Sequence, residues 1–226
     1  TPVMNSNGYL LNAKRIVALG EAGLYAMQMS IDNVVPNEVS KKSLRPLMPK
    51  LQALAEHAAF RVRINTVLGS GPPEEAVAVA RAVTELGFEA KCSLVRDETG
   101  AVVPVGEAER LAYEQIRAME RKSPFYLSED FQGGLIDGRA LDFKCRAGAR
   151  FFHVCEDGLV HLCTPRWGQD AEPLLSYGRE QIRAAFHTQK SCASSCAVAY
   201  AHQASRLDTR RGQKIPPSRV RLPVVA

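Results

Sequence analysis

The sequence predicts an α/β fold, an incomplete parallel (β/α) partial TIM barrel of about four β/α units followed by a small hairpin-plus-helix cysteine-rich domain. Three observations lead to this fold class. Strand-like and helix-like stretches alternate through residues 1–121, in units of about 30 residues. The pattern changes after the Gly-containing segment 122–141, and five of the six cysteines lie beyond that segment.

The four units can be justified in chain order. Asn12 is a cap residue for the first helix. Pro46 and Pro49 are expected to break the second helix early. Residues 60–68 alternate as a strand does, and Pro72–Glu75 suits the first turn of a helix. The expected strands are 2–6, 24–31, 60–68 and 90–95, and the expected helices are 12–22, 40–58, 72–86 and 107–121. The helix residues expected to face the core are Ile16, Val17, Leu19, Leu51, Leu54, Ala55, Val79, Val83 and Leu86.

Polar residues recur where each expected strand ends. They are Asn5–Asn7, Ser30–Asn33, Asn65–Thr66 and Arg96–Asp97. In β/α folds this carboxyl edge of the sheet is where ligands bind. Capping of the next helix is the alternative reading for any single residue, but four such edges together favour a site.

Four units are too few to close a parallel barrel. The sequence is therefore expected to be the later part of a longer protein, with Thr1 as a cut edge. The composition, 46% apolar and 23% charged over 226 residues, is typical of soluble globular proteins. No apolar run reaches the roughly 20 residues of a membrane span, and no secretion signal is present, so a cytoplasmic protein without a membrane partner is expected.

The positive charge lies at the carboxyl end. From Arg206 onward there are six cations and one acid, a net +5 that equals the net charge of the whole chain. Residues 1–205 are therefore neutral, and nucleic acid is not an expected partner. The expected divisions are a partial barrel over 1–121, a linker over 122–141, a cysteine-rich domain over 142–208 and a basic disordered tail over 209–226.

Within the cysteine-rich domain, a hairpin is expected from 150–154 and 159–162, with its turn at 156–158, followed by helices over 178–187 and 197–207. Cys145, Cys163, Cys192 and Cys196 supply the four thiolates that a zinc site or an iron–sulfur cluster requires. Because only one short motif, C-x3-C at Cys192 and Cys196, is present instead of two C-x2-C knuckles, the spacing favours iron–sulfur over zinc. Cys155 could replace one of these ligands.

The remaining candidate side chains are expected to pack. Cys92 lies in an apolar strand and is expected in the core. His153 and His161 lie on the two hairpin strands, and they and Trp167 are expected to pack rather than to bind a metal.

The motifs resemble those of radical S-adenosylmethionine (SAM) enzymes. Residues 5–11 (NSNGYLL) contain the family's N-G-x-L turn, and residues 30–32 (SID) match its S-[IL]-D segment. Cys145, twelve residues, Gly158, four residues and Cys163 match the opening of the SPASM or twitch extension. The similarity spans residues 3–207. The family's C-x3-C-x2-C and G-G-E-P motifs are absent and would precede Thr1.

The resemblance implies specific roles. Asn7, Ser30, Asp32 and Asn65 would line the SAM cavity, and Cys145, Cys163, Cys192 and Cys196 would hold one auxiliary [4Fe-4S] cluster. It also implies a peptide or small-molecule substrate and an electron donor such as a flavodoxin or ferredoxin. Residues 1–226 alone are expected to be inactive. Two alternatives are a non-catalytic α/β binding module with a structural zinc site or disulfides, and a natural truncation that keeps the cluster without catalysis.

Overall fold

The computed structural model describes residues 1–120 and 130–210, which form two compact units. The first unit consists of Thr1–Asp97 and Ala101–Ala140, and the second of Glu98–Gly100 together with the chain from Leu141 onward. None of the helices in the described ranges has the length and apolarity that a membrane span requires.

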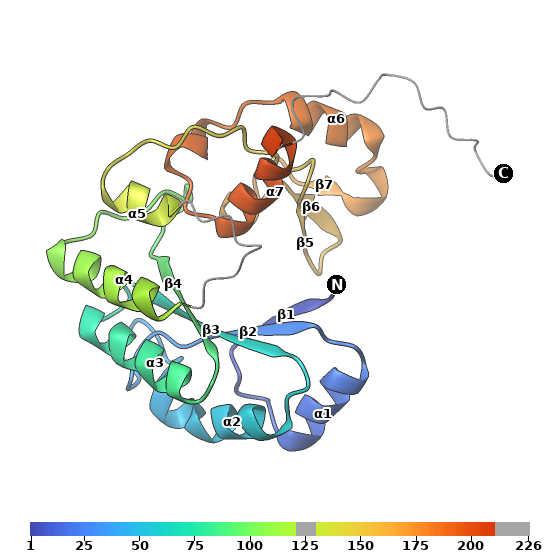
Figure 1. Ribbon diagram of the computed structural model, residues 1–226. Coiled ribbons are helices and arrows are strands. Elements are labelled where there is room, and N and C mark those ends of the chain that lie inside the picture. The colour runs from blue at the N-terminus through green and yellow to red at the C-terminus, as the bar shows by residue number, and fades with distance from the viewer. Residues whose placement is uncertain (121–129, 211–226) are drawn as a thin grey trace. The chain divides into compact units, whose positions relative to one another are not determined.

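The first unit is a four-stranded parallel sheet in the order β1-β2-β3-β4, with a helix after each strand (Figure 1). The predicted alternation of parallel strands and helices is confirmed. The strands are β1 (Val3–Ser6), β2 (Ala26–Ser30), β3 (Arg61–Leu68) and β4 (Glu89–Leu94). The helices are α1 (Ala13–Glu21), α2 (Leu44–His57), α3 (Pro73–Glu85), α4 (Glu107–Met119) and α5 (Phe131–Ile136).

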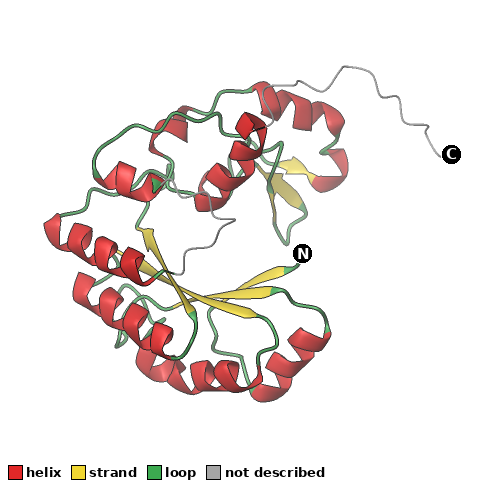
Figure 2. Ribbon diagram, viewed as in Figure 1, coloured by secondary structure: helices red, strands yellow, loops and turns green. Residues whose placement is uncertain are grey.

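Helices α1 to α4 cover one face of this sheet (Figure 2). The strands are added in one direction, and right-handed crossovers then place every connecting helix on the same side. Burial alternates along β2, β3 and β4 accordingly. The buried side chains of these strands are Met27, Met29, Val62, Ile64, Thr66, Leu68, Ala90, Cys92 and Leu94. The core therefore lies between the sheet and its helices.

Local sequence sets the helix boundaries. The Asn12 side chain accepts the Arg15 N–H at 2.9 Å and caps α1. The break expected at the two prolines of α2 is wrong. Because α2 begins only at Leu44, Pro46 falls in its first turn, where no N–H is needed, and the helix continues through Pro49. Its buried leucines hold it against the sheet despite the lost hydrogen bond.

Two of the core residues predicted for the helices are wrong. Val17 is 42% exposed, and Ala55 is exposed as well. Each directly follows a fully buried residue, Ile16 or Leu54. Successive positions of a helix point about 100° apart, and in α1 and α2 the second residue of each pair falls outside the buried stripe.

The segment expected as a linker is partly helical. Residues 121–129 lie outside the described residues, and Phe131–Ile136 forms α5. The Asp130 side chain caps this helix by accepting the Gly133 N–H at 3.0 Å. Of the expected basic tail, residues 211–226 lie outside the described residues, whereas residues 209–210 end the last helix.

The second unit contains a three-stranded antiparallel sheet in the order β5-β6-β7. Its first two strands form the expected hairpin around residues 156–158, whereas the third strand was not expected. The strands are β5 (His153–Val154), β6 (Leu159–His161) and β7 (Glu172–Pro173). The helices are α6 (Arg179–His187) and α7 (Ala199–Arg210), with short 3-10 turns η1 (Thr164–Arg166), η2 (Leu174–Ser176) and η3 (Ser191–Ser195).

We predict that Gly8→Ala destabilises the first unit more than Gly23→Ala. Both glycines have φ near +80°, which disfavours any side chain. A Cβ at Gly8 would lie 2.3 Å from Met29 Sδ in the core, whereas one at Gly23 meets nothing within 4 Å. The free energy of unfolding in urea should fall by about 1 kcal/mol for Gly23→Ala and about 2–4 kcal/mol for Gly8→Ala. Equal losses would contradict the packing described here.

Candidate metal centre and ligand face

Four cysteines from separate segments of the second unit gather in one place. We call them the thiol quartet: Cys145, Cys163, Cys192 and Cys196. Cys145 precedes the hairpin, Cys163 follows β6 as the cap of η1, and Cys192 and Cys196 belong to η3 and its end. Cys145, Cys163 and Cys196 are buried in one apolar cluster, and Cys192 is half-buried.

The thiols of the quartet lie close enough to influence one another electrostatically. Burial raises the pKa of Cys196 to about 11, and the charges of Cys145, Cys192 and Cys163 raise it further. Burial also raises the pKa of Cys163 and of Cys145, and Cys192 adds to both shifts. A cation bound among these sulfurs would remove that mutual repulsion.

Backbone groups act on the pKa of three of the four thiols. Backbone hydrogen bonds from Ala147, Arg166 and Val198 act on Cys145, Cys163 and Cys196 respectively, and the Arg166 N–H also donates to the Cys163 carbonyl at 3.1 Å. Each bond lowers the pKa of its thiol because it stabilises the thiolate. Hydrogen bonds of this kind orient thiolate ligands and tune the metal that they hold.

Cationic side chains surround the quartet. Lys190 is only 6% exposed, and its Nζ donates to the Thr188 carbonyl at 3.0 Å and to the Ala185 carbonyl. Lys190 and Arg146 lower the pKa of Cys145, and Arg166 lowers that of Cys163. Because burying a lysine is costly, this charge needs nearby anions. Thiolates of the quartet would supply those anions if the thiols bound a metal.

The quartet is more widely spaced than a single-zinc site. Four thiolates on one Zn²⁺ at about 2.3 Å lie roughly 3.8 Å apart. Among residues 1–120 and 130–210, the group of three ligand atoms lying within 4.8 Å of one another is formed by Cys155, Asp157 and His161. No three quartet sulfurs of the described chain meet that distance. Cys155 thus sits with these hairpin residues rather than with the quartet.

All six cysteines are free thiols. Cys92 lies on the buried face of β4 in the first unit, where burial raises its pKa to about 12. It is a core residue of that sheet.

The first unit has a polar sheet face opposite its helices. A parallel sheet that helices cover on both faces is apolar on both faces. The polar residues of this face therefore indicate that it is not packed against helices of the sheet. Ser93 lies within hydrogen-bonding reach of Asn65, with Oγ 2.9 Å from Oδ1. Although burial raises it, hydrogen bonds from Arg61 and Arg63 hold the pKa of Glu89 below its ordinary value. By register, the polar residues on this face are Asn5, Gln28, Ser30, Arg61, Arg63, Asn65, Glu89, Lys91 and Ser93, with Val3, Ala26 and Val67 among them.

The structure brings two of the four predicted SAM-cavity residues together. Ser30 ends β2 and is the register partner of Asn65. Asn65 and Thr66 were expected at the end of their strand, but β3 continues to Leu68, so both lie within it. Asp32 lies just beyond β2, buried, with Oδ2 bound to Ser40 Oγ at 2.7 Å and Lys42 Nζ at 3.0 Å. Asn7 is exposed after β1, and its Oδ1 accepts the Tyr9 N–H at 3.3 Å.

The same edge carries buried polar atoms that have no hydrogen-bond partner in the described chain. They are Asp32 Oδ1 and both side-chain amide atoms of Asn33, a residue 1% exposed. Unsatisfied buried polar atoms are costly, so a polar ligand or water at this edge would stabilise them. The sequence pattern placed Asn33 in the polar stretch Ser30–Asn33 but did not identify it as a ligand-binding residue.

The buried lysine beside the thiols could not be identified from sequence. Lys190 lies two residues before Cys192 and reads as an ordinary surface charge. A lysine two residues before a C-x3-C pair is a weak signal of burial.

No protein-family model matches this sequence, and no curated protein matches it.

We predict that iodoacetamide modifies Cys192 before the other quartet thiols in the metal-free protein. Cys192 is half-buried, whereas the other three are less than 9% exposed. With a pKa of about 11, Cys196 is a thiolate in about one molecule in a thousand at pH 8. Its modification rate should rise about tenfold per pH unit up to that pKa. Peptide mass spectrometry measures both, and equal rates at all four thiols would contradict this order.

Proposed function

We propose that this chain is the carboxyl-terminal portion of a radical SAM enzyme, and that its thiol quartet holds one auxiliary [4Fe-4S] cluster. The observation that carries the proposal is the gathering of Cys145, Cys163, Cys192 and Cys196 with N–H donors and cations around them. Four cysteine ligands are the usual set for such a cluster. When bound, the cluster supplies one-electron transfer.

The donor set fits iron–sulfur better than a single zinc ion. The sulfurs are spaced beyond the distance that one tetrahedral zinc imposes, as described above. Four thiolates around either metal leave excess negative charge. Lys190, Arg146 and Arg166 offset that charge, and the backbone N–H groups distribute it.

The polar sheet face supports a role in ligand binding. Ser30 lies at the carboxyl end of β2, the edge where β/α enzymes bind substrates, and Asn65 lies beside it within β3. Asp32 and Asn33 add buried polar atoms that await a partner. These residues would hold and orient SAM and a peptide or small-molecule substrate. A flavodoxin or ferredoxin in the cytoplasm would be the electron donor.

We predict that anaerobic reconstitution with iron and sulfide gives about four irons per chain and a broad visible charge-transfer band. Cys145→Ser, Cys163→Ser and Cys196→Ser should each lose most of the iron, because each removes one ligand. Cys92→Ser and Cys155→Ser should retain it, since neither thiol belongs to the quartet. Metal analysis and the absorbance spectrum measure the outcome.

Metal content distinguishes the iron–sulfur cluster from a zinc module, and the control variants test the ligand set. One tightly held zinc per chain, with no iron after reconstitution, would leave the non-catalytic zinc module as the function. Iron loss in Cys155→Ser equal to that in Cys145→Ser would show that the ligand set is wrong.

We also predict that residues 1–226, loaded with iron and reduced, release no 5′-deoxyadenosine from SAM. Cleavage of the SAM sulfonium in this family needs the C-x3-C-x2-C motif, which these residues lack. Chromatography of the reaction mixture measures the nucleoside. Its formation above the protein-free control would contradict this division of roles.

A further inference from the structure

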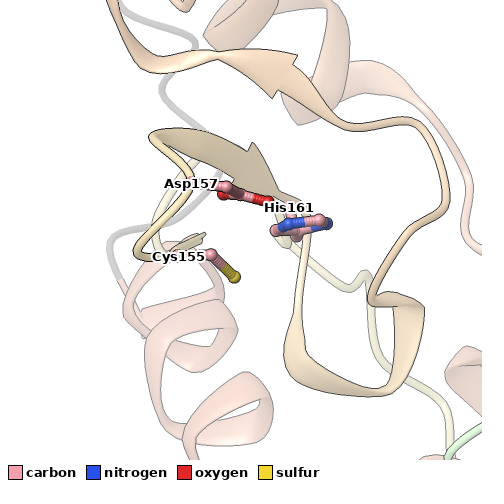
Figure 3. A group of neighbouring side chains, drawn as sticks. All are labelled: Cys155, Asp157 and His161. Carbon is pink, nitrogen blue, oxygen red and sulfur yellow. The ribbon is translucent and has the colours of Figure 1, made fainter.

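The hairpin of the second unit places three different ligand types side by side. Cys155 follows β5, Asp157 lies in the turn, and His161 ends β6. One sulfur, one carboxylate oxygen and one ring nitrogen lie within 4.8 Å of one another (Figure 3). These three atoms converge because the tight turn, closed by the Gly158 N–H to the Cys155 carbonyl at 3.0 Å, folds the two strands together.

His161 has one ring nitrogen without a hydrogen-bond partner in the described chain. The side chain is 1% exposed, and its Nε2 has no hydrogen-bond partner in the described chain. Its Nδ1 accepts the Gly168 N–H at 3.1 Å, so the remaining ring nitrogen is the one without a partner. Figure 3 shows the ring beside Asp157 and Cys155. A buried unpartnered nitrogen is costly, and a metal ion would satisfy it.

The carboxylate is already held in position. Asp157 Oδ1 accepts the Leu159 N–H at 2.9 Å, a bond that holds the carboxylate and leaves Oδ2 out of it. Hydrogen bonds of this kind to a ligand are typical of metal sites, because they fix its orientation. The Cys155 thiol is 8% exposed, so the group is shielded on the protein side and open through Asp157.

We propose that Cys155, Asp157 and His161 form a second metal site, for one zinc ion or a similar divalent transition metal. Sulfur, nitrogen and oxygen ligands together suit Zn²⁺ better than Mg²⁺ or Ca²⁺. A thiolate and a carboxylate neutralise its charge. Three protein ligands leave a fourth position for water or a substrate atom.

Binding of the metal at His161 requires a change in the neighbouring turn. The Gly168 N–H donates to Nδ1, so the neutral ring carries its proton on Nε2, the atom that must bind the metal. When the metal takes Nε2, the proton moves to Nδ1 and then faces the Gly168 N–H. Two donors cannot pair, so the turn must present an acceptor instead.

The turn at Arg166–Gln169 can do so by rotating one peptide. It has type II geometry, with Trp167 at φ −56° and ψ 133°, Gly168 at φ +75°, and the Gln169 N–H bonded to the Arg166 carbonyl at 3.1 Å. Rotation of the Trp167–Gly168 peptide converts type II to type I and exchanges the Gly168 N–H for the Trp167 carbonyl. That carbonyl accepts the new Nδ1 proton. Metal binding and turn type are therefore coupled.

Cobalt(II) titration tests the site, with bound metal counted per chain and the thiolate-to-cobalt absorbance recorded. Cys155→Ser and Asp157→Asn should each lower the bound cobalt by one equivalent, or weaken that equivalent by at least about tenfold. Asp157→Asn keeps the Oδ1 acceptor of an exposed turn residue, so loss of folding does not explain its effect. The matched controls Glu156→Gln, in the same turn, and His153→Gln, opposite His161, should bind as the unmodified chain does.

Gly168→Ala tests the coupled turn. A Cβ at Gly168 meets nothing within 4 Å, but the residue disfavours the left-handed φ of the type II turn. The variant should therefore bind cobalt about five- to tenfold more tightly at this site. Gly138→Ala, with a similar φ of +72° and equally open space, is the matched control and should leave cobalt binding unchanged.

Unchanged cobalt stoichiometry and affinity in both Cys155→Ser and Asp157→Asn would overturn the second site. Weaker binding in Gly168→Ala would overturn the peptide rotation. The iron content of the thiol quartet is measured separately, so failure of the second site is distinguishable from failure of the proposed cluster.

Discussion

The handedness of the β/α crossovers is the constraint on which the first unit depends. Strands β1 to β4 are joined in one direction, and each crossover places its helix on the same side of the sheet. The apolar side chains of the strands must therefore point to that side, and the opposite face is free of that demand. Polar side chains such as Ser30, Asn65 and Lys91 can occupy it without cost to the core. The topology therefore permits a polar face before any single residue is considered.

In the second unit, the corresponding constraint is the free-energy cost of burying charge. Its apolar core is small, and three of its buried side chains are the thiols Cys145, Cys163 and Cys196. Without a metal, burial keeps these thiols protonated, and Lys190 remains a buried cation at a cost. With a metal, the thiolates, the backbone N–H groups and the lysine neutralise one another. A cation at the proposed thiol site would therefore offset charges that burial otherwise disfavours.

The sequence was most informative where a periodic pattern met a specific cap or turn residue. Asn12 and the 60–68 alternation located α1 and β3 to within a residue or two, and parallel pairing followed from the repetition of units. The sequence was least informative about burial on short helices. It could not show that Ile16 faces the core while its neighbour Val17 faces solvent. Strand β7 has two residues, too few for any periodicity to reveal.

Some residues of the candidate sites could likewise be identified from the sequence, and others could not. Cysteines are few and chemically distinctive, so the quartet could be named from its residue types and spacing alone. Residues whose role depends on the fold could not be named. Lys190 becomes significant because it is buried, and His161 because the hairpin register brings it to Cys155 and Asp157. The spacing C-x-D-x3-H across a two-stranded turn was present in the sequence, but histidine on a strand is common and reads as packing.

The two ligand groups differ in a way that separates their metals. The quartet offers sulfur alone, in an apolar cluster with cations nearby, and suits a soft metal centre that carries excess negative charge. The hairpin group offers sulfur, oxygen and nitrogen, with two formal negative charges that match one divalent ion. Because Cys155 belongs to the second group, it would not compete for iron at the proposed cluster site. The two proposed sites are therefore independent, since each would select its metal through its own ligands.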